Sequence, residues 1–158
     1  MHGWSEPEML SEINNSLIFI HWQFSVDSWG NLYCGAGEKG DGKNGYIYCS
    51  KYINGKYDAP HKLSTEVNEE GSHNYSPSIS HDGNMIIFTR NQNPATMYVS
   101  FKDKNGKWSK AKDLNSIFHC RSCLNPILTA DGKYLFYLAG GYPYWVSTKI
   151  IEELIPKE

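Results

Sequence analysis

The chain has 158 residues, a formal net charge of −2 and a pI near 6.3, so it lacks the cationic excess that nucleic-acid binding requires. Aromatic residues make up 14% of the chain and glycine occurs 14 times, a composition that favours short strands and tight turns. No apolar run approaches the roughly 18 residues that cross a bilayer, so the sequence predicts neither a nucleic-acid nor a membrane partner.

The first recurring phrase in chain order is "GWSEPEML", residues 3–10, which returns as "GKYDAPHKL" from Gly55 and as "GKWSKAKDL" from Gly106. Each later copy contains the glycine of an Asn-Gly pair, which is a tight-turn signal, and each closes a run of strand-like segments. We therefore expect residues 3–10 to be the fourth, outermost strand of a blade whose first three strands do not precede it in the chain.

Three units follow, and each contains a strand, a glycine turn and a second strand. The units cover approximately residues 18–63, 72–114 and 122–149. Their turn glycines, Gly30, Gly83 and Gly132, lie about 50 residues apart. Asp82 and Asp131 directly precede two of these glycines, and we assign both carboxylates to hairpin turns. Four short antiparallel strands repeated at this interval are typical of β-propeller blades.

A third strand of each unit ends in serine, as "IYCS", "MYVS" and "YWVS". Alignment on the serine places Tyr48, Tyr98 and Trp145 at equivalent positions. Because the aromatic residue recurs in every unit, we expect these three rings to pack between neighbouring sheets.

The phrases "SPSISHDGNMIIFTR", "LNPILTADGKYLFY" and "IYCSKYINGKY" resemble the WD-like repeat of TolB-type β-propeller proteins. The closing "YWVSTKIIEEL" resembles the C-terminal end of bacterial propeller proteins of unassigned function. The resemblance extends from residue 4 to about residue 154, and it implies that the chain matches only the C-terminal half of those proteins. The family often has an aspartate before the third strand, where this chain has Tyr46, Thr96 and Pro143.

The predicted fold class is all-β: a single β-propeller domain over residues 1–158 with three four-stranded antiparallel blades. Residues 150–158 form a C-terminal tail that starts with a short helical turn. Since propellers have 4 to 8 blades, we expect two chains to form a homodimer with six blades, in which each chain donates its strand 3–10 to the other. The alternative is a fragment of a longer propeller.

In a propeller, the loops that enter the innermost strands lie at the mouth of the central channel. Aligned on the turn glycines, these loops supply the candidate binding residues, which are His21, Trp22, His73, Asn74, Tyr75, His119 and Arg121. Imidazole, amide and aromatic groups favour a peptide, a protein, a saccharide or another small polar molecule as the ligand.

Four cysteines are present. Cys34 and Cys49 lie in apolar strand-like runs and are expected to be buried thiols. Cys120 and Cys123, beside His119, have the spacing of half a zinc site, so a metal site, a reversible disulfide and two ordinary thiols remain open. No second such pair occurs, and no cofactor is assigned.

The sequence contains no Gly-x-Ser-x-Gly elbow, phosphate-binding loop or His-Glu-x-x-His motif. The predicted channel mouth also has few carboxylates for acid–base catalysis. We therefore expect a non-catalytic binding module. The alternatives are a carbohydrate-active or metal-dependent enzyme, or a truncated product without an independent role. The sequence shows no signal peptide, which predicts a cytoplasmic protein, or a periplasmic or exported one if an upstream segment precedes it.

Overall fold

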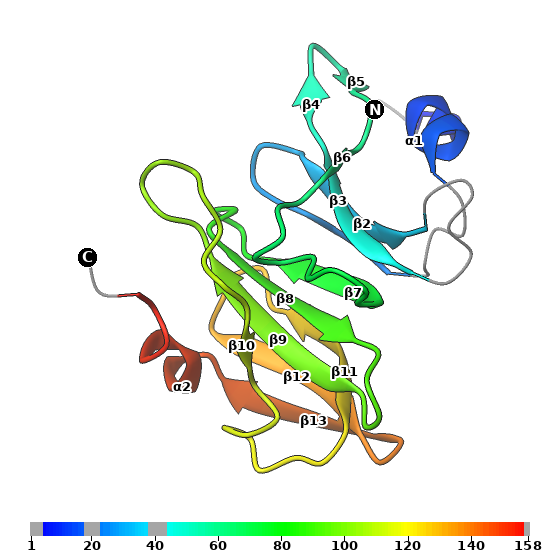
Figure 1. The fold of residues 1–158 in the computed structure, drawn as a ribbon. Coiled ribbons are helices and arrows are strands. Elements are labelled where there is room, and N and C mark those ends of the chain that lie inside the picture. The colour runs from blue at the N-terminus through cyan, green and yellow to red at the C-terminus, as the bar shows by residue number, and fades with distance from the viewer. Residues whose placement is uncertain (1–4, 18–22, 38–43, 157–158) are drawn as a thin grey trace.

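The computed structural model describes residues 5–17, 23–37 and 44–156, which form antiparallel sheets and two short helices (Figure 1). Every strand in the described part of the chain has six residues or fewer, as expected from strand-forming runs interrupted by glycine and asparagine turns. The all-β prediction is therefore confirmed. Within the described residues, no helix is both long and apolar enough to cross a lipid bilayer.

Three sheets each begin as a simple meander, and two of them gain a fourth strand. Sheet I contains β1 (Phe24–Val26), β2 (Leu32–Ala36), β3 (Tyr46–Ser50) and β6 (His61–Lys62). Sheet II contains β7 (Asn74–Ile79), β8 (Met85–Arg90), β9 (Thr96–Phe101) and β10 (Lys112–Asp113). Sheet III contains β11 (Cys123–Leu128), β12 (Tyr134–Ala139) and β13 (Tyr142–Ser147). The remaining elements are a small hairpin of β4 (Tyr52–Ile53) and β5 (Lys56–Tyr57), α1 (Ser11–Ser16) and α2 (Lys149–Glu152).

Aspartates hold the turns between the first and second strands. Asp82 accepts hydrogen bonds from the Ser80 hydroxyl and the Asn84 N–H at 2.6 and 3.1 Å, and Gly83 between them has a φ of +67°. Sheet I lacks the Asp-Gly pair. There Asp27, three residues before Gly30, accepts two backbone N–H groups at 3.0 Å. Both turns need a residue in the left-handed region, which glycine adopts without steric cost.

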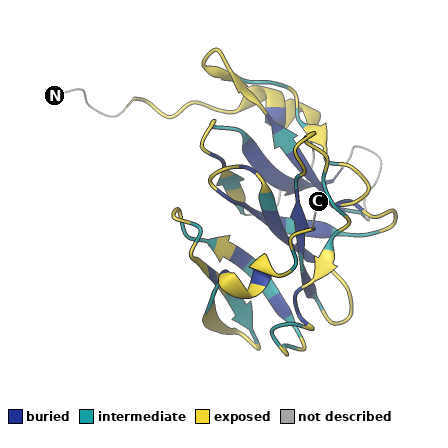
Figure 2. Cartoon of the chain, turned by 90° about the vertical axis from the view of Figure 1, so that its left-hand side faces the viewer, coloured by how far each residue is buried: buried dark blue, intermediate teal, exposed yellow. Residues whose placement is uncertain are grey.

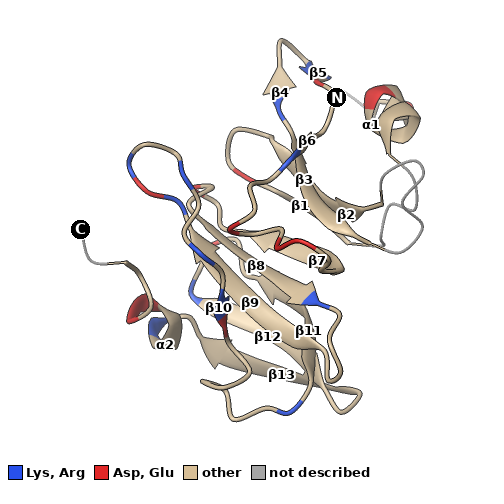
Figure 3. Ribbon diagram, in the orientation of Figure 1, with Lys and Arg blue, Asp and Glu red and all other residues tan. Residues whose placement is uncertain are grey.

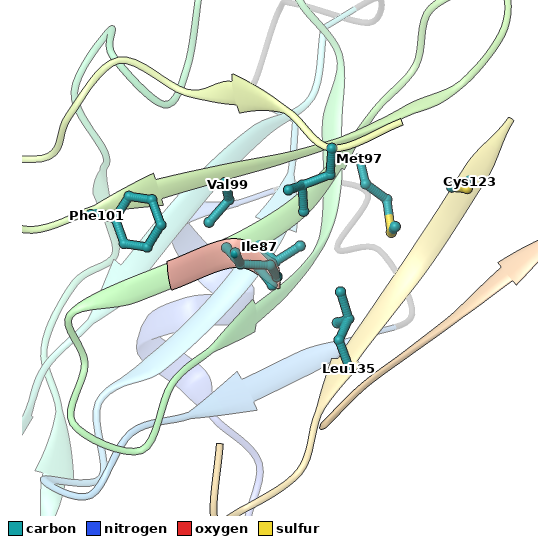
Figure 4. Close-up of a cluster of buried hydrophobic side chains, with 8 residues drawn as sticks. Ile87, Met97, Val99, Phe101, Cys123 and Leu135 are labelled. Atoms are coloured by element: carbon teal, nitrogen blue, oxygen red, sulfur yellow. The ribbon is translucent and has the colours of Figure 1, made fainter. Parts of the chain in front are cut away.

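Sheet II lies between the other two sheets (Figure 1). Successive residues of a strand point to opposite faces of the sheet, so Ile86 and Phe88 pack against sheet I while Ile87 and Val99 pack against sheet III. All four side chains have 0% exposure. Figure 4 shows the cluster between sheets II and III, in which Ile87 and Val99 lie opposite Leu135 of β12.

The first strands of the three sheets, β1, β7 and β11, lie next to one another. A repeated hydrogen bond aligns them. The Ile79 N–H donates to the Ser25 hydroxyl at 3.1 Å, and the Leu128 N–H donates to the Ser78 hydroxyl at 2.9 Å. Ser25, Ser78 and Ile127 therefore occupy equivalent positions in the three sheets.

This equivalence corrects the alignment of the third strands. Pairing with the second strand places Tyr48 opposite Cys34, Tyr98 opposite Phe88, and Tyr144 opposite Tyr137. The counterpart of Tyr48 and Tyr98 is thus Tyr144, and the expectation that Trp145 packs between two sheets of the chain is wrong. A shift of one residue moves a side chain to the other face, and Trp145 is 63% exposed.

Sheet III presents one uncovered apolar face. Ile127, Tyr134, Phe136 and Trp145 are 56%, 41%, 44% and 63% exposed on this face. No strand of this sheet contains a charged residue (Figure 3). Among the described residues, no fourth strand pairs with the outer edge of β13.

The N-terminal segment lies at the end of the molecule opposite to sheet III, beside sheet I (Figure 1). Residues 5–10 form no strand within this chain and extend, exposed, into α1 (Figure 2), and residues 3 and 4 lie outside the described residues. Ile13 of α1 is only 1% exposed, because it packs on the outer face of sheet I. Sheet I therefore has its outer face partly covered, whereas the outer face of sheet III is open.

Candidate functional site

A pocket of about 500 Å³ lies where the first strands of sheets II and III begin. We call it the inner-strand pocket. It is lined by Gln23, His73, Tyr75, Ser76, Asn91, Leu124, Asn125 and Ile127. The lining comes from the segments just before or within β1, β7 and β11, and from the residue that follows β8.

Two proline-directed bulges shape this pocket. Pro77 and Pro126 have no N–H for the ladder, and the pairing of β7 with β8 and of β11 with β12 shifts around each of them. The residues before the prolines, Ser76 and Asn125, have φ values of +50° and +55°. Strain of this kind persists where the surrounding structure imposes it, often at binding sites. The Ser76 hydroxyl donates to Asn125 Oδ1 at 3.0 Å, which joins the two bulges.

Hydrogen bonds within the protein orient two of the three amide side chains of the lining, those of Gln23 and Asn125. Gln23 Nε2 donates to the Pro126 carbonyl at 2.5 Å, and Asn125 Oδ1 accepts the Ser76 hydroxyl. These bonds leave Gln23 Oε1 as an acceptor and Asn125 Nδ2 as a donor, and neither atom has a hydrogen-bond partner among the described residues. Gln23 and Asn125 therefore offer an acceptor and a donor to a ligand.

The described lining carries no aspartate, glutamate, lysine or arginine. His73 and Tyr75 place their rings edge to face, with centroids 6.0 Å apart, and burial raises the pKa of the Tyr75 hydroxyl. Leu124 and Ile127 form an apolar side of the pocket. The described residues contain no group of three or more His, Cys, Asp or Glu side chains able to hold a metal ion.

Two predicted site residues, His73 and Tyr75, line this pocket. Asn74, which lies between them in the sequence and was predicted with them, does not. Asn74 has 0% exposure. Its Nδ2 donates to Asn68 Oδ1 at 3.2 Å, and its Oδ1 accepts Arg90 Nε at 2.9 Å. The amide lies behind the pocket wall because strand alternation turns it away from its neighbours.

The predicted residues before β11 do not line the pocket either. Cys120 and Cys123 are joined by a disulfide, and Cys123 belongs to the core between sheets II and III. His119 and Arg121 are exposed, and the Arg121 carbonyl accepts a hydrogen bond from the Asn115 amide at 3.4 Å. His21 and Trp22 lie outside the described residues.

The other two cysteines are free thiols, but the prediction that both are buried is confirmed only for Cys34, since Cys49 is half-buried. Cys34 is buried, and burial, together with the nearby Cys49, raises the pKa of its thiol to about 12. Burial also raises the pKa of Cys49. Neither residue belongs to the lining of the pocket.

Sequence reasoning did not identify Gln23, Ser76, Asn91 and Asn125 as lining residues. A signal for two of them was present. Ser76 and Asn125 each precede a proline at the same place in successive units, and a repeated proline within a strand indicates a bulge. Gln23 and Asn91 carry no such signal, because their positions depend on how the sheets stack.

The chain was compared with family models, curated proteins and solved structures, and matches come from the solved structures. No family model and no curated protein matches the chain. Among solved structures, the chain is similar to TolB from Acinetobacter baumannii, with 18% sequence identity and a TM-score of 0.49. The match covers 78% of this chain and 28% of the TolB chain.

Proposed function

We propose that the chain is a non-catalytic binding module whose inner-strand pocket binds an uncharged peptide segment. The main support is the described lining, which combines an acceptor on Gln23, a donor on Asn125, two aromatic rings and an apolar side. A peptide group offers one N–H and one C=O, which match this acceptor and donor. A charged ligand would lose its hydration without gaining a counter-charge.

We further propose that the three sheets are propeller blades, corresponding to the units 18–63, 72–114 and 122–149. Two chains would close a ring of six blades around one channel. The uncovered face of sheet III supports this arrangement, since the equivalent face of sheet II is buried against the next sheet. In such a ring the two inner-strand pockets lie around a common axis.

Ligand-observed NMR with the neutral peptide N-acetyl-trialanine amide tests the binding proposal. We expect saturation transfer to the capped peptide and a weaker signal from trialanine with free, charged ends. The variant Asn125→Leu removes the donor, and a lost hydrogen bond of about 1 kcal/mol predicts roughly fivefold to tenfold weaker binding. Asn105→Leu, in the exposed turn between β9 and β10, is the matched control and should bind as the wild type does.

Three results would contradict the proposal. One is the absence of saturation transfer to the capped peptide, and another is equal binding by the Asn125 variant. The third is conversion of a bound probe, since turnover of the peptide or of a neutral disaccharide such as chitobiose would indicate an enzyme. Binding of chitobiose alone would assign the pocket to saccharides.

A further inference from the structure

We infer that residues 10–14 of one copy tie sheet III of a second copy to sheet I of their own chain. This inference rests on the proposed two-chain ring and adds the contacts that would hold it together. The sequence "LSEIN" at residues 10–14, here called the N-terminal connector, is similar to "LSTEVN" at residues 63–68, here called the internal connector. The internal connector joins sheet I to sheet II.

The internal connector places one apolar side chain between two sheets. Val67 has 0% exposure, and it belongs to the cluster that contains Tyr33 and Ile47 of sheet I and Ile86 and Phe88 of sheet II. A helical turn positions it, because the Val67 N–H donates to the Ser64 carbonyl at 3.1 Å.

The N-terminal connector contacts sheet I as the internal connector contacts sheet II. Ile13, the counterpart of Val67, packs with Leu32 and Cys34 of β2. By the strand pairing, Leu32 and Cys34 are the counterparts of Ile86 and Phe88 in sheet II. The N-terminal connector therefore already occupies the position of a link from a preceding sheet.

An asparagine ties the internal connector to the sheet that precedes it. Asn68 Oδ1 accepts the Ile47 N–H at 2.8 Å, and its Nδ2 donates to the Ile47 and Leu63 carbonyls at 2.9 and 3.0 Å. Asn115 repeats part of this contact by accepting the Met97 N–H at 3.0 Å. Ile47 and Met97 occupy the same position in the third strands of sheets I and II.

The corresponding pair in the N-terminal connector and sheet III is Asn14 and Pro143. Asn14 is exposed, and its side chain forms no hydrogen bond among the described residues. Pro143, the counterpart of Ile47 in β13, is also exposed. Proline has no N–H, so Asn14 Nδ2 would donate to the Pro143 carbonyl of the second copy. Within one chain, sheet II lies between α1, which contains Asn14, and β13, which contains Pro143 (Figure 1).

A second copy fits this position because sheet III has the complementary features. The outer edge of β13 has no partner among the described strands. Phe136 and Trp145 are 44% and 63% exposed, whereas their counterparts in sheet II, Ile87 and Val99, have 0% exposure. Residues 5–10, which lead into α1, would pair with this edge.

Cysteine cross-linking tests the contact. Asn14→Cys protein is mixed with Pro143→Cys protein under mild oxidation, after unfolding and refolding together so that the chains can exchange. We expect a covalent dimer on a non-reducing gel that depends on both variants. A mixture of Asn14→Cys with Asn105→Cys is the matched control and should give little of this product.

Light scattering on the wild-type protein tests the two-chain ring separately from the contact between Asn14 and Pro143. A mass near 18.0 kDa, that of one chain, would overturn the two-chain ring and with it this inference. A mass twice as large without the specific cross-link would leave the dimer standing and overturn the contact between Asn14 and Pro143. A dimer with the cross-link supports both.

Discussion

At the scale of single residues, the buried polar groups beside the pocket hydrogen-bond within the protein, whereas polar groups of the lining face the pocket. Asn74 and Arg90 are 0% and 3% exposed, and neighbouring side-chain and backbone groups satisfy their hydrogen bonds. Arg90 donates to Asn74, to the Val67 carbonyl and to Glu69. This network fixes the internal connector and the start of β7, which positions His73 and Tyr75.

Removal of the Asn74 amide should destabilise the protein more than it weakens binding. In Asn74→Ala, the Arg90 Nε–H loses its buried acceptor, which costs about 2 to 4 kcal/mol of unfolding free energy. Urea unfolding monitored by tryptophan fluorescence measures the change. Asn105→Ala, in an exposed turn, should shift the unfolding free energy by less than about 0.5 kcal/mol, and an equal loss in both variants would contradict the assigned role of Asn74.

At the scale of elements, the turns fix where each strand begins. Gly83 and Gly106 both have a positive φ, of +67° and +77°. They differ in surroundings, because a Cβ at residue 83 would lie 3.1 Å from the Trp29 ring and 3.2 Å from the Asp27 carboxylate, whereas one at residue 106 would meet nothing within 4 Å.

These two glycines give a matched pair of substitutions. Gly106→Ala should lose about 1 kcal/mol of stability from backbone strain alone. Gly83→Ala should lose more, about 2 kcal/mol, because the added methyl also displaces the Trp29 ring. Thermal unfolding of both variants checks the order, and a larger loss for Gly106→Ala would contradict this account of the turns.

At the scale of the whole molecule, sheet II is covered on both faces and the outer face of sheet I is partly covered, whereas the outer face of sheet III is open. Leu63 and Leu114 are the last residues of the repeated phrases that begin at Gly55 and Gly106. Leu114 has 0% exposure. Leu10, at the same place in the first phrase, is 38% exposed, and its neighbour Met9 is 75% exposed. In the proposed ring, the second copy would bury Leu10 and leave Met9 exposed to solvent. The counterparts of Met9 in the later phrases, Lys62 and Asp113, are likewise exposed.

Substitution of these neighbours therefore tests the assembly. Leu10→Ser should weaken the proposed dimer by about tenfold or more, since a buried leucine contributes about 1.5 to 3 kcal/mol. Met9→Ser should leave the dimer unchanged. Sedimentation equilibrium measures both dissociation constants, and equal effects would show that Leu10 is not specifically buried between the copies.

The sequence predicted the repeat, the glycine turns and the all-β class, because strand-forming runs and Asp-Gly or Asn-Gly pairs act over a few residues. It misaligned Trp145 with Tyr48 and Tyr98, because a shared serine carries no information on strand register. His73 and Tyr75 line the pocket, whereas Asn74, which the sequence groups with them as a loop residue, belongs to β7 and points away from the pocket.

The sequence by itself determined where the strands turn and which repeat unit each belongs to, since these depend on local backbone preferences. Only the tertiary structure decided that Gln23, Asn91 and Asn125 line one pocket with His73, because residues from different sheets meet there through the stacking of those sheets. It also decided that Ile13 is buried on sheet I while Trp145 stays exposed on sheet III. Burial depends on which neighbour a face meets, and no local pattern specifies that neighbour.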